Sequence, residues 1–151
     1  MTGEAPMETI LVVDDEPDVC ELARDCLVPE GYSVLDARDG DEALRIAEGH
    51  TGPVHLLLTD VVMPRLNGVE LAARVIRQRP DTKVLYMSAF AVIGAQPEQL
   101  SGPGLQPGDP ILPKPFSTEA LTRKVREVLD RPAPSRSPFS RARARPDQWW
   151  P

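Results

Sequence analysis

Short apolar runs alternate with amphipathic segments along most of the chain, and this alternation constrains its fold more than any other feature. The run from Ile10 to Val13 is wholly apolar and rich in β-branched residues, as expected of a strand buried on both faces of a parallel sheet. Comparable runs predict further strands at 32–35, 54–58, 83–87 and 111–112. Because segments of helical spacing separate these strands, we predict a doubly wound α/β sheet.

The segments between the strands carry ordinary helix signals, with one exception. Pro17 suits the first position of a helix, Gly31 suits the end of that helix, and Ser117 can cap the last one. Residues 94–110, where a fourth helix would fall, hold four glycines and four prolines. A long amphipathic helix cannot carry that many helix breakers, so we expect the fourth helix to be short, irregular or replaced by a loop.

A chain of 151 residues has room for one domain and a short appendage. We assign residues 8–130 to the domain, 1–7 to a flexible N-terminus and 131–151 to a disordered tail rich in Arg and Pro. The net charge is −6, but the tail carries +4, which leaves −10 on the rest of the chain. This acidic balance argues against nucleic acid as a partner. No run approaches the roughly 18 apolar residues of a membrane span, and no signal peptide is visible, so we expect no membrane association and a cytoplasmic location.

The tail allows two interpretations. Its arginines could contact acidic partners or nucleic acid, and Trp149-Trp150 could enter an apolar pocket. The simpler interpretation, which the sequence alone favours, is a solvated end without fixed structure.

Polar side chains follow the predicted strands at their carboxyl ends, which is where parallel α/β sheets form their sites. Carboxylates follow the first and third strands, a hydroxyl follows the fourth and a lysine follows the fifth: Asp14, Asp15, Asp60, Ser88 and Lys114. Three crowded carboxylates repel one another, and a hard divalent cation such as Mg²⁺ relieves the repulsion. A lysine and a hydroxyl beside them suit a transferred phosphoryl group. The alternative, that these residues only cap helices, weakens when all five fall on four strand ends.

Four sequence blocks resemble those of response-regulator receiver domains, the phosphoacceptor modules of two-component signalling. In chain order they are ILVVDDE at 10–16, LTDVVMP at 58–64, YMSA at 86–89 and KPF at 114–116. The resemblance covers about residues 8–130 and is nearest in character to receivers of hybrid sensor kinases. It implies a flavodoxin-like parallel sheet of five strands in the order 2-1-3-4-5, with helices on both faces.

The resemblance also implies how phosphoryl transfer would work. Asp60 would be the nucleophile that takes the phosphoryl group from a phosphohistidine. Lys114 would pair with the transferred group, and Ser88 would turn toward it. The bond between Lys114 and Pro115 would be cis, which X–Pro bonds allow at small cost.

A Mg²⁺ site follows from the same resemblance. Asp15 would bind the metal directly, Asp14 mainly through water, and Val62 through its backbone carbonyl, with Asp60 completing the site. Gly68 opens the third helix just beyond these residues, and it is either an ordinary helix-start glycine or part of the site.

The function implied is that of a receiver in a phosphorelay, with a histidine kinase or phosphotransfer protein upstream and an unknown protein downstream. We expect the chain to catalyse only its own phosphorylation and slow dephosphorylation, to act without an output domain of its own, and to be a monomer or weak dimer. One alternative is a phosphatase of the haloacid-dehalogenase kind, which would need a second acid two residues beyond its nucleophile, here Asp14 followed by Glu16. Another is a receiver fold kept only as a binding scaffold, which the intact acceptor residues disfavour.

Two features depart from the common receiver pattern. Many receivers place Tyr or Phe three residues before the lysine, whereas this chain has Ile111, so the aromatic rotamer switch is unavailable. Together with the segment 94–110, this argues against the usual dimerisation through the fourth and fifth helices. Val62 and Phe90 would flank the position of an attacking water and cannot orient it, which predicts slow self-dephosphorylation.

Overall fold

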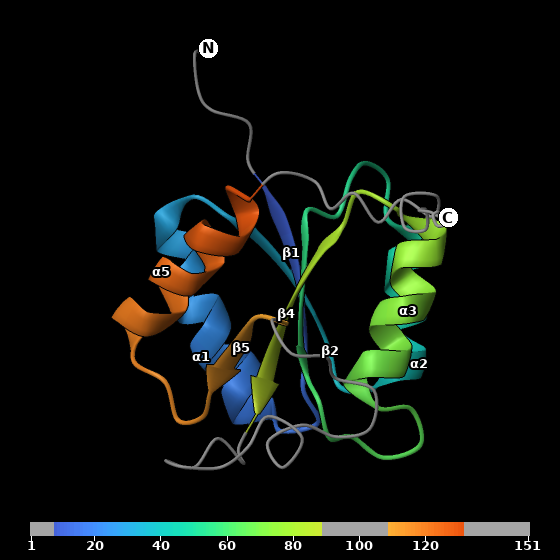
Figure 1. Ribbon diagram of the computed structural model, residues 1–151, viewed down its shortest axis with the longest axis horizontal. Helices are drawn as coiled ribbons and strands as arrows, with labels where there is room; N and C mark the ends of the chain where they lie inside the picture. The colour runs from blue at the N-terminus through green and yellow to red at the C-terminus, as the bar shows by residue number, and fades with distance from the viewer. Residues whose placement is uncertain (1–7, 89–108, 132–151) are drawn as a thin grey trace, which may run out of the picture.

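The computed structural model describes residues 8–88 and 109–131, and it confirms the predicted fold class (Figure 1). The described strands form one wholly parallel sheet in the order β2-β1-β3-β4-β5, which is the flavodoxin-like order. In chain order these strands are β1 (Thr9–Val13), β2 (Ser33–Ala37), β3 (Leu56–Asp60), β4 (Lys83–Ser88) and β5 (Ile111–Pro113).

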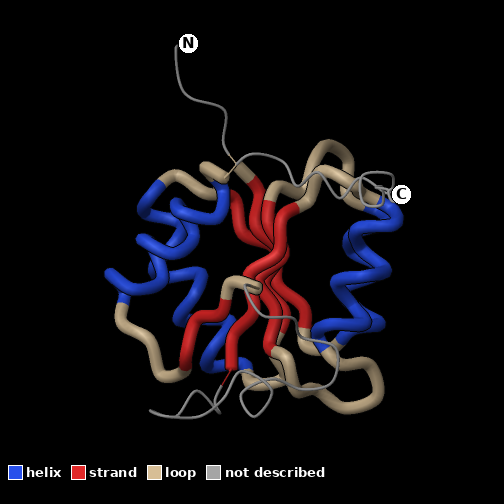
Figure 2. The backbone as a smooth tube through the Cα atoms, in the orientation of Figure 1, coloured by secondary structure: helices blue, strands red, loops and turns tan. Residues whose placement is uncertain are grey.

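Helices cover both faces of the sheet, α1 and α5 on one side and α2 and α3 on the other (Figures 1 and 2). Their bounds are α1 (Pro17–Leu27), α2 (Gly40–Gly49), α3 (Gly68–Gln78) and α5 (Thr118–Leu129), with a single 3-10 turn, η1 (Val28–Glu30), after α1. The predicted helix signals at Pro17 and Ser117 are confirmed, whereas Gly31 ends η1 and not α1 itself. Pro17 is the first residue of α1, the Ser117 hydroxyl accepts a hydrogen bond from the Ala120 amide at 3.0 Å, and Gly31 turns the chain with a φ of 102°.

Alternate residues of each strand separate the core into two layers. In β1, Ile10 and Val12 pack in the layer under α1 and α5, while Leu11 and Val13 pack in the layer under α2 and α3. All four side chains are fully buried, as the wholly apolar run predicts for a central parallel strand. Leu22 is an exception to the helical pattern, because 41% of it remains exposed although the spacing groups it with buried residues of α1.

Several expectations fall on residues that the structure does not describe. They are the flexible N-terminus at 1–7, the irregular fourth helix in 94–110 up to residue 108, the role of Phe90, and the tail beyond Arg131. Among the residues that are described, no helix has the length and apolar character to cross a membrane.

Candidate functional site

The candidate site lies at the carboxyl edge of the sheet, where four strands end side by side. Asp14 and Asp15 follow β1, Asp60 is the last residue of β3, Ser88 is the last residue of β4, and Lys114 follows β5. A backbone hydrogen bond of 2.9 Å from the Lys114 amide to the Ser88 carbonyl joins the last two strands at this edge. The structure therefore brings all five residues predicted from the strand ends to one edge.

Three of these residues form a compact acidic cluster. Asp14, Asp15 and Asp60 each offer a carboxylate oxygen, and these oxygens lie within 4.8 Å of one another. Asp14 is fully buried and Asp60 is nearly so, whereas Asp15 is exposed. An all-oxygen donor set with one solvent-facing side suits a hard cation that keeps part of its water shell, so the residues present fit Mg²⁺.

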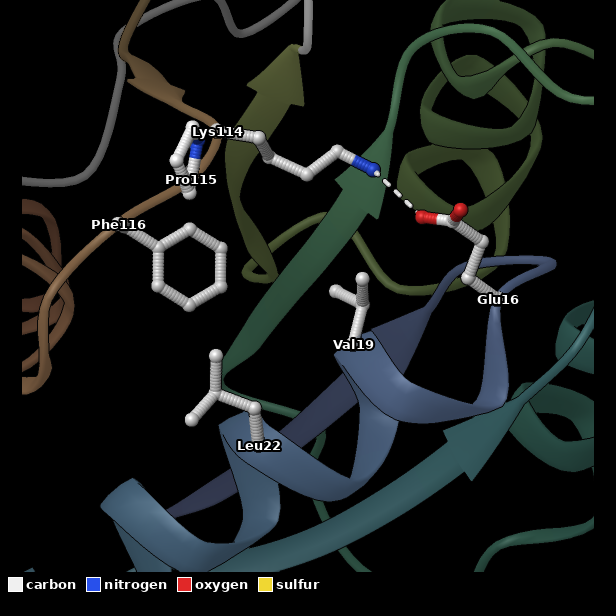
Figure 3. A pocket seen from close by; sticks show the side chains of 6 residues that line it. All are labelled: Glu16, Val19, Leu22, Lys114, Pro115 and Phe116. Atoms are coloured by element: carbon white, nitrogen blue, oxygen red, sulfur yellow. Dashed lines mark ion pairs between the residues drawn. The ribbon is translucent and has the colours of Figure 1, made fainter.

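Lys114 is the counter-charge of this cluster. Its Nζ lies 2.9 Å from Asp14 Oδ2 and 3.6 Å from Asp60 Oδ2. It also lies 3.8 Å from Glu16 Oε1, and Figure 3 shows this third ion pair. Although burial alone lowers the pKa of Lys114, its hydrogen bond to Asp14 and the charge of Asp60 raise that pKa overall. The lysine is thus held as a cation, but it is a single positive charge among three nearby carboxylates.

The excess of negative charge has its clearest effect on the pKa of Asp60. Burial, and next the negative charge of Asp14, raise the pKa of Asp60 from 3.8 to about 6, although Lys114 lowers it in part. Burial also raises the pKa of Asp14, against the hydrogen bonds that it accepts at 2.9 Å from the Glu16 amide and at 2.9 Å from Lys114. Additional positive charge would favour the ionised form of both carboxylates, and this is the condition under which Asp60 is a nucleophile.

The loop after β3 is held against the site by close backbone packing. The Gly68 amide donates a hydrogen bond of 2.8 Å to the Val61 carbonyl. A side chain at Gly68 would collide with the backbone carbonyl of Asp60, so close packing against the end of β3 requires a glycine at this position. The Val62 amide hydrogen-bonds the Asp60 carboxylate, and Val62 itself is half exposed. The bond between Lys114 and Pro115 is cis, as the resemblance implies.

Sequence reasoning missed two contacts around the site. Glu16 contributes the third carboxylate near Lys114, and Arg65 reaches from the loop after β3 to Asp39 at the start of α2, at 3.3 Å. Arg65 and Asp39 are 26 residues apart, so no local pattern could have paired them. A φ of 70° at Arg65, in the left-handed region, was equally invisible in the sequence.

Known proteins are similar to this chain in sequence. The family model described as the response regulator receiver domain matches residues 10–126. The transcriptional regulatory protein CpxR of Klebsiella pneumoniae subsp. pneumoniae (strain HS11286) is 36% identical over 125 residues, which are 83% of this chain and 50% of CpxR. The response regulator MprA of Mycobacterium sp. (strain KMS) is 38% identical over 134 residues, 88% of this chain and 55% of MprA. The sensor kinase CckA of Brucella abortus (strain 2308) is 36% identical over 126 residues, 82% of this chain and 13% of CckA. The chain thus spans about half the length of CpxR and MprA.

Solved structures are similar over nearly their whole length. The chemotaxis protein CheY4 of Vibrio cholerae has a TM-score of 0.66 at 27% identity, covering 82% of this chain and 99% of CheY4. The response regulator TrrA of Thermotoga maritima, in complex with Mg²⁺ and BeF, has a TM-score of 0.64 at 30% identity, covering 81% and 99%. A structure of the histidine kinase ThkA in complex with TrrA has a TM-score of 0.63 at 30% identity, covering 82% and 100%.

Proposed function

The chain belongs to the response-regulator receiver family of two-component signalling, and on this premise we propose that it accepts a phosphoryl group on Asp60. One observation carries the proposal. Asp60 ends a central strand, shares a potential cation site with Asp14 and Asp15, and lies 3.6 Å from the Lys114 ammonium. A carboxylate nucleophile between a cation site and a lysine has what phosphoryl transfer requires, namely positioning and charge neutralisation.

In the proposed reaction, a carboxylate oxygen of Asp60 attacks the phosphorus of a phosphohistidine. The new O–P bond forms as the P–N bond breaks, and the electron pair of that bond stays with the imidazole nitrogen, which takes up a proton. Lys114 offsets the negative charge that arrives with the phosphoryl oxygens, and Ser88, buried at the end of β4, supplies a hydroxyl at the same edge. Mg²⁺, when bound, would neutralise charge on the transferred group.

The metal ligands proposed are Asp15, Asp60 and the backbone carbonyl of Val62, with Asp14 acting mainly through water. The exposure of Asp15 supports direct binding, since no cation is paired with it among the described residues. Asp14 supports the indirect role, because its two carboxylate oxygens already accept hydrogen bonds from the Glu16 amide and from Lys114.

The proposed phosphodonor is a histidine kinase or a phosphotransfer protein, which the complex of ThkA with TrrA supports by similarity. The downstream partner, the cytoplasmic location, the oligomeric state and action without an output domain stay predictions from the sequence. The family match disfavours the phosphatase alternative. Glu16, the second acid that such a phosphatase would need, is exposed and pairs with Lys114 at 3.8 Å.

Incubation with acetyl phosphate and Mg²⁺, followed by intact-mass measurement, tests the proposal. The wild type should gain the mass of one phosphoryl group, and Asp60→Ala should gain none. Asp41→Asn, a change of an exposed aspartate in α2, is the matched control and should gain as much as the wild type. A wild-type protein without mass gain, or an Asp60→Ala variant that gains as much as the wild type, would contradict the proposal.

A further inference from the structure

An apolar groove opens between α1 and the loop that leads into α5 (Figure 3). Val19 and Leu22 rise from α1 toward the ring of Phe116, and Pro115 completes the apolar lining. Glu16 and Lys114 line the groove as well, and Lys114 links it to the phosphoryl site. The cavity volume is about 390 Å³, which lies within the range of roughly 300–1,000 Å³ typical of sites that enclose a small organic group.

The rim of this groove is acidic. Asp18 precedes Leu22 by four residues and Asp25 follows it by three, so both lie on the same side of α1 as Leu22. Both are exposed, as is Glu16. The basic residue of α1, Arg24, is paired with Asp36 of β2 at 3.1 Å and is thereby partly neutralised. An apolar slot with a negative rim fits a segment that combines aromatic side chains with cations.

The chain itself contains such a segment. Residues 131–151 carry five arginines against one aspartate, and they include Trp149 and Trp150, the only two tryptophans of the protein. This composition complements both the apolar lining and the acidic rim of the groove.

The distance from the end of α5 to the groove is short for this segment. α5 has 12 residues, or about 18 Å of helix, and the groove lies at its first turn beside Phe116. About six residues in an extended conformation span that distance. Because 17 residues separate Arg131 from Trp149, the tryptophan can reach the groove. A connection of this length also holds its end at an effective concentration of the order of 1 mM, so a contact with a Kd of about 1 mM is formed about half of the time.

We propose that the segment 132–151 docks within the same molecule, with a tryptophan in the groove of Val19, Leu22 and Phe116 and its arginines against the acidic rim. The docked segment covers the side of Lys114 that faces the groove and competes with any protein that approaches Asp60 over α1. The docking goes beyond the proposed phosphoacceptor function and does not depend on it.

Tryptophan fluorescence tests the docking directly, because both tryptophans lie in the proposed ligand. The full chain at low micromolar concentration should emit at shorter wavelength than a synthetic peptide of residues 132–151. Its quenching constant with acrylamide should be about three quarters that of the peptide, because one of the two rings is docked for about half of the time. The difference should shrink in 0.5 M salt, because the contact of arginines with the rim is screened.

A matched pair of variants separates docking from a general effect on the fold. Leu22→Lys places a cation inside the groove and should raise the quenching constant to the value of the free peptide. Val28→Lys adds the same charge at a valine that is 47% exposed and outside the groove, and it should leave the quenching unchanged. Circular dichroism should confirm that both variants are folded, and Trp149→Ala and Trp150→Ala identify the docked ring.

Two results would overturn the proposal. The first is a full chain with the emission and quenching of the peptide. The second is a difference that grows with protein concentration, which would assign the groove to the tail of a second copy.

Discussion

The two edges of the sheet differ in how their charged side chains are arranged. At the carboxyl edge, three carboxylates cluster within 4.8 Å around one lysine, and the pKa of Asp60 is raised to about 6. At the amino edge, the Arg126 guanidinium of α5 donates hydrogen bonds of 3.0 and 3.1 Å to Glu8, and it also bonds Asp130 and the Tyr32 hydroxyl. Hydrogen bonding, first to Glu8, raises the pKa of Arg126. At the carboxyl edge buried carboxylates share one lysine, whereas at the amino edge the two carboxylates that bond Arg126 are partly exposed to water.

The difference shows what each edge contributes to the protein. The amino-edge network ties the start of β1, the start of β2 and the end of α5 together, so it stabilises the fold. The carboxyl-edge cluster opposes folding, because ionised carboxylates are buried beside one another without enough positive charge. Strongly perturbed carboxylates are typical of functional sites, where the missing charge arrives with a ligand.

Gly68→Ala should have the largest effect on this contrast, because it disrupts the backbone that positions the acidic cluster. The added Cβ would collide with the Asp60 carbonyl and force the loop after β3 away, at a cost of about 2–3 kcal/mol in unfolding free energy. Urea unfolding measures this loss, and the rate of phosphorylation by acetyl phosphate should fall as well.

Gly49→Ala is the matched control for that change. Gly49 is also a helical glycine, but an added Cβ there meets nothing within 4 Å. The control should therefore be neutral or stabilising by about 0.5–1 kcal/mol. Equal effects of the two substitutions would show that close packing at Gly68 is unimportant.

Arg126→Met should have the second-largest effect, because it removes the guanidinium that bonds Glu8 and Asp130 at the amino edge. Because the arginine side chain is 45% exposed, its partners can be hydrated after the change, and we expect a loss of only about 1 kcal/mol. Urea unfolding beside Arg123→Met, an exposed arginine of the same helix, gives the comparison. If the Arg123 variant loses as much stability as the Arg126 variant, the network does not stabilise the fold.

Val62→Asn should have the smallest effect of these changes, and it tests only the site at the carboxyl edge. The valine side chain is 50% exposed beside Asp60, and an amide in its place can orient a water toward the phosphoryl group. We expect the phosphorylated protein to decay faster by a factor below about 10, since one orienting group supplies only part of general acid–base catalysis. Val28→Asn, at an equally exposed valine of η1, should not change the decay. An unchanged or longer lifetime of the Val62 variant would contradict the prediction.

The sequence predicted the sheet and its acidic edge because both follow from short patterns. Apolar runs locate the strands, and parallel strands carry the residues after them to one edge. What could not be predicted depends on pairing between distant segments. β2 extends to Ala37 instead of ending at Leu35, because Asp36 and Ala37 pair with Val12 and Val13 of β1.

The exposure of a side chain was equally hard to predict where it depends on how two elements pack together. Leu22 has the spacing of a core residue, yet it lies over the groove beside Phe116 and stays 41% exposed. The raised pKa of Asp60 likewise requires its burial and its distance to Asp14, neither of which a single strand-end motif contains.

The central claim, that the carboxyl edge is short of positive charge, predicts how Asp60→Asn changes stability. The pKa of Asp60 in the folded protein, about 6, lies above its ordinary value of 3.8, so ionisation of this group destabilises the fold. The cost is fully present above pH 6 and is lost as the pH falls from 6 toward 4. At pH 7.5 without divalent cations, the asparagine variant should therefore be more stable by about 3 kcal/mol, and this advantage should shrink toward pH 4.

The most direct measurement is urea unfolding of the wild type and Asp60→Asn at pH 7.5, each with EDTA and with Mg²⁺. We predict that the variant is the more stable protein in EDTA and that Mg²⁺ stabilises the wild type more than the variant. A variant that is less stable than the wild type in EDTA, together with equal stabilisation of both by Mg²⁺, would contradict a charge-deficient site at Asp60.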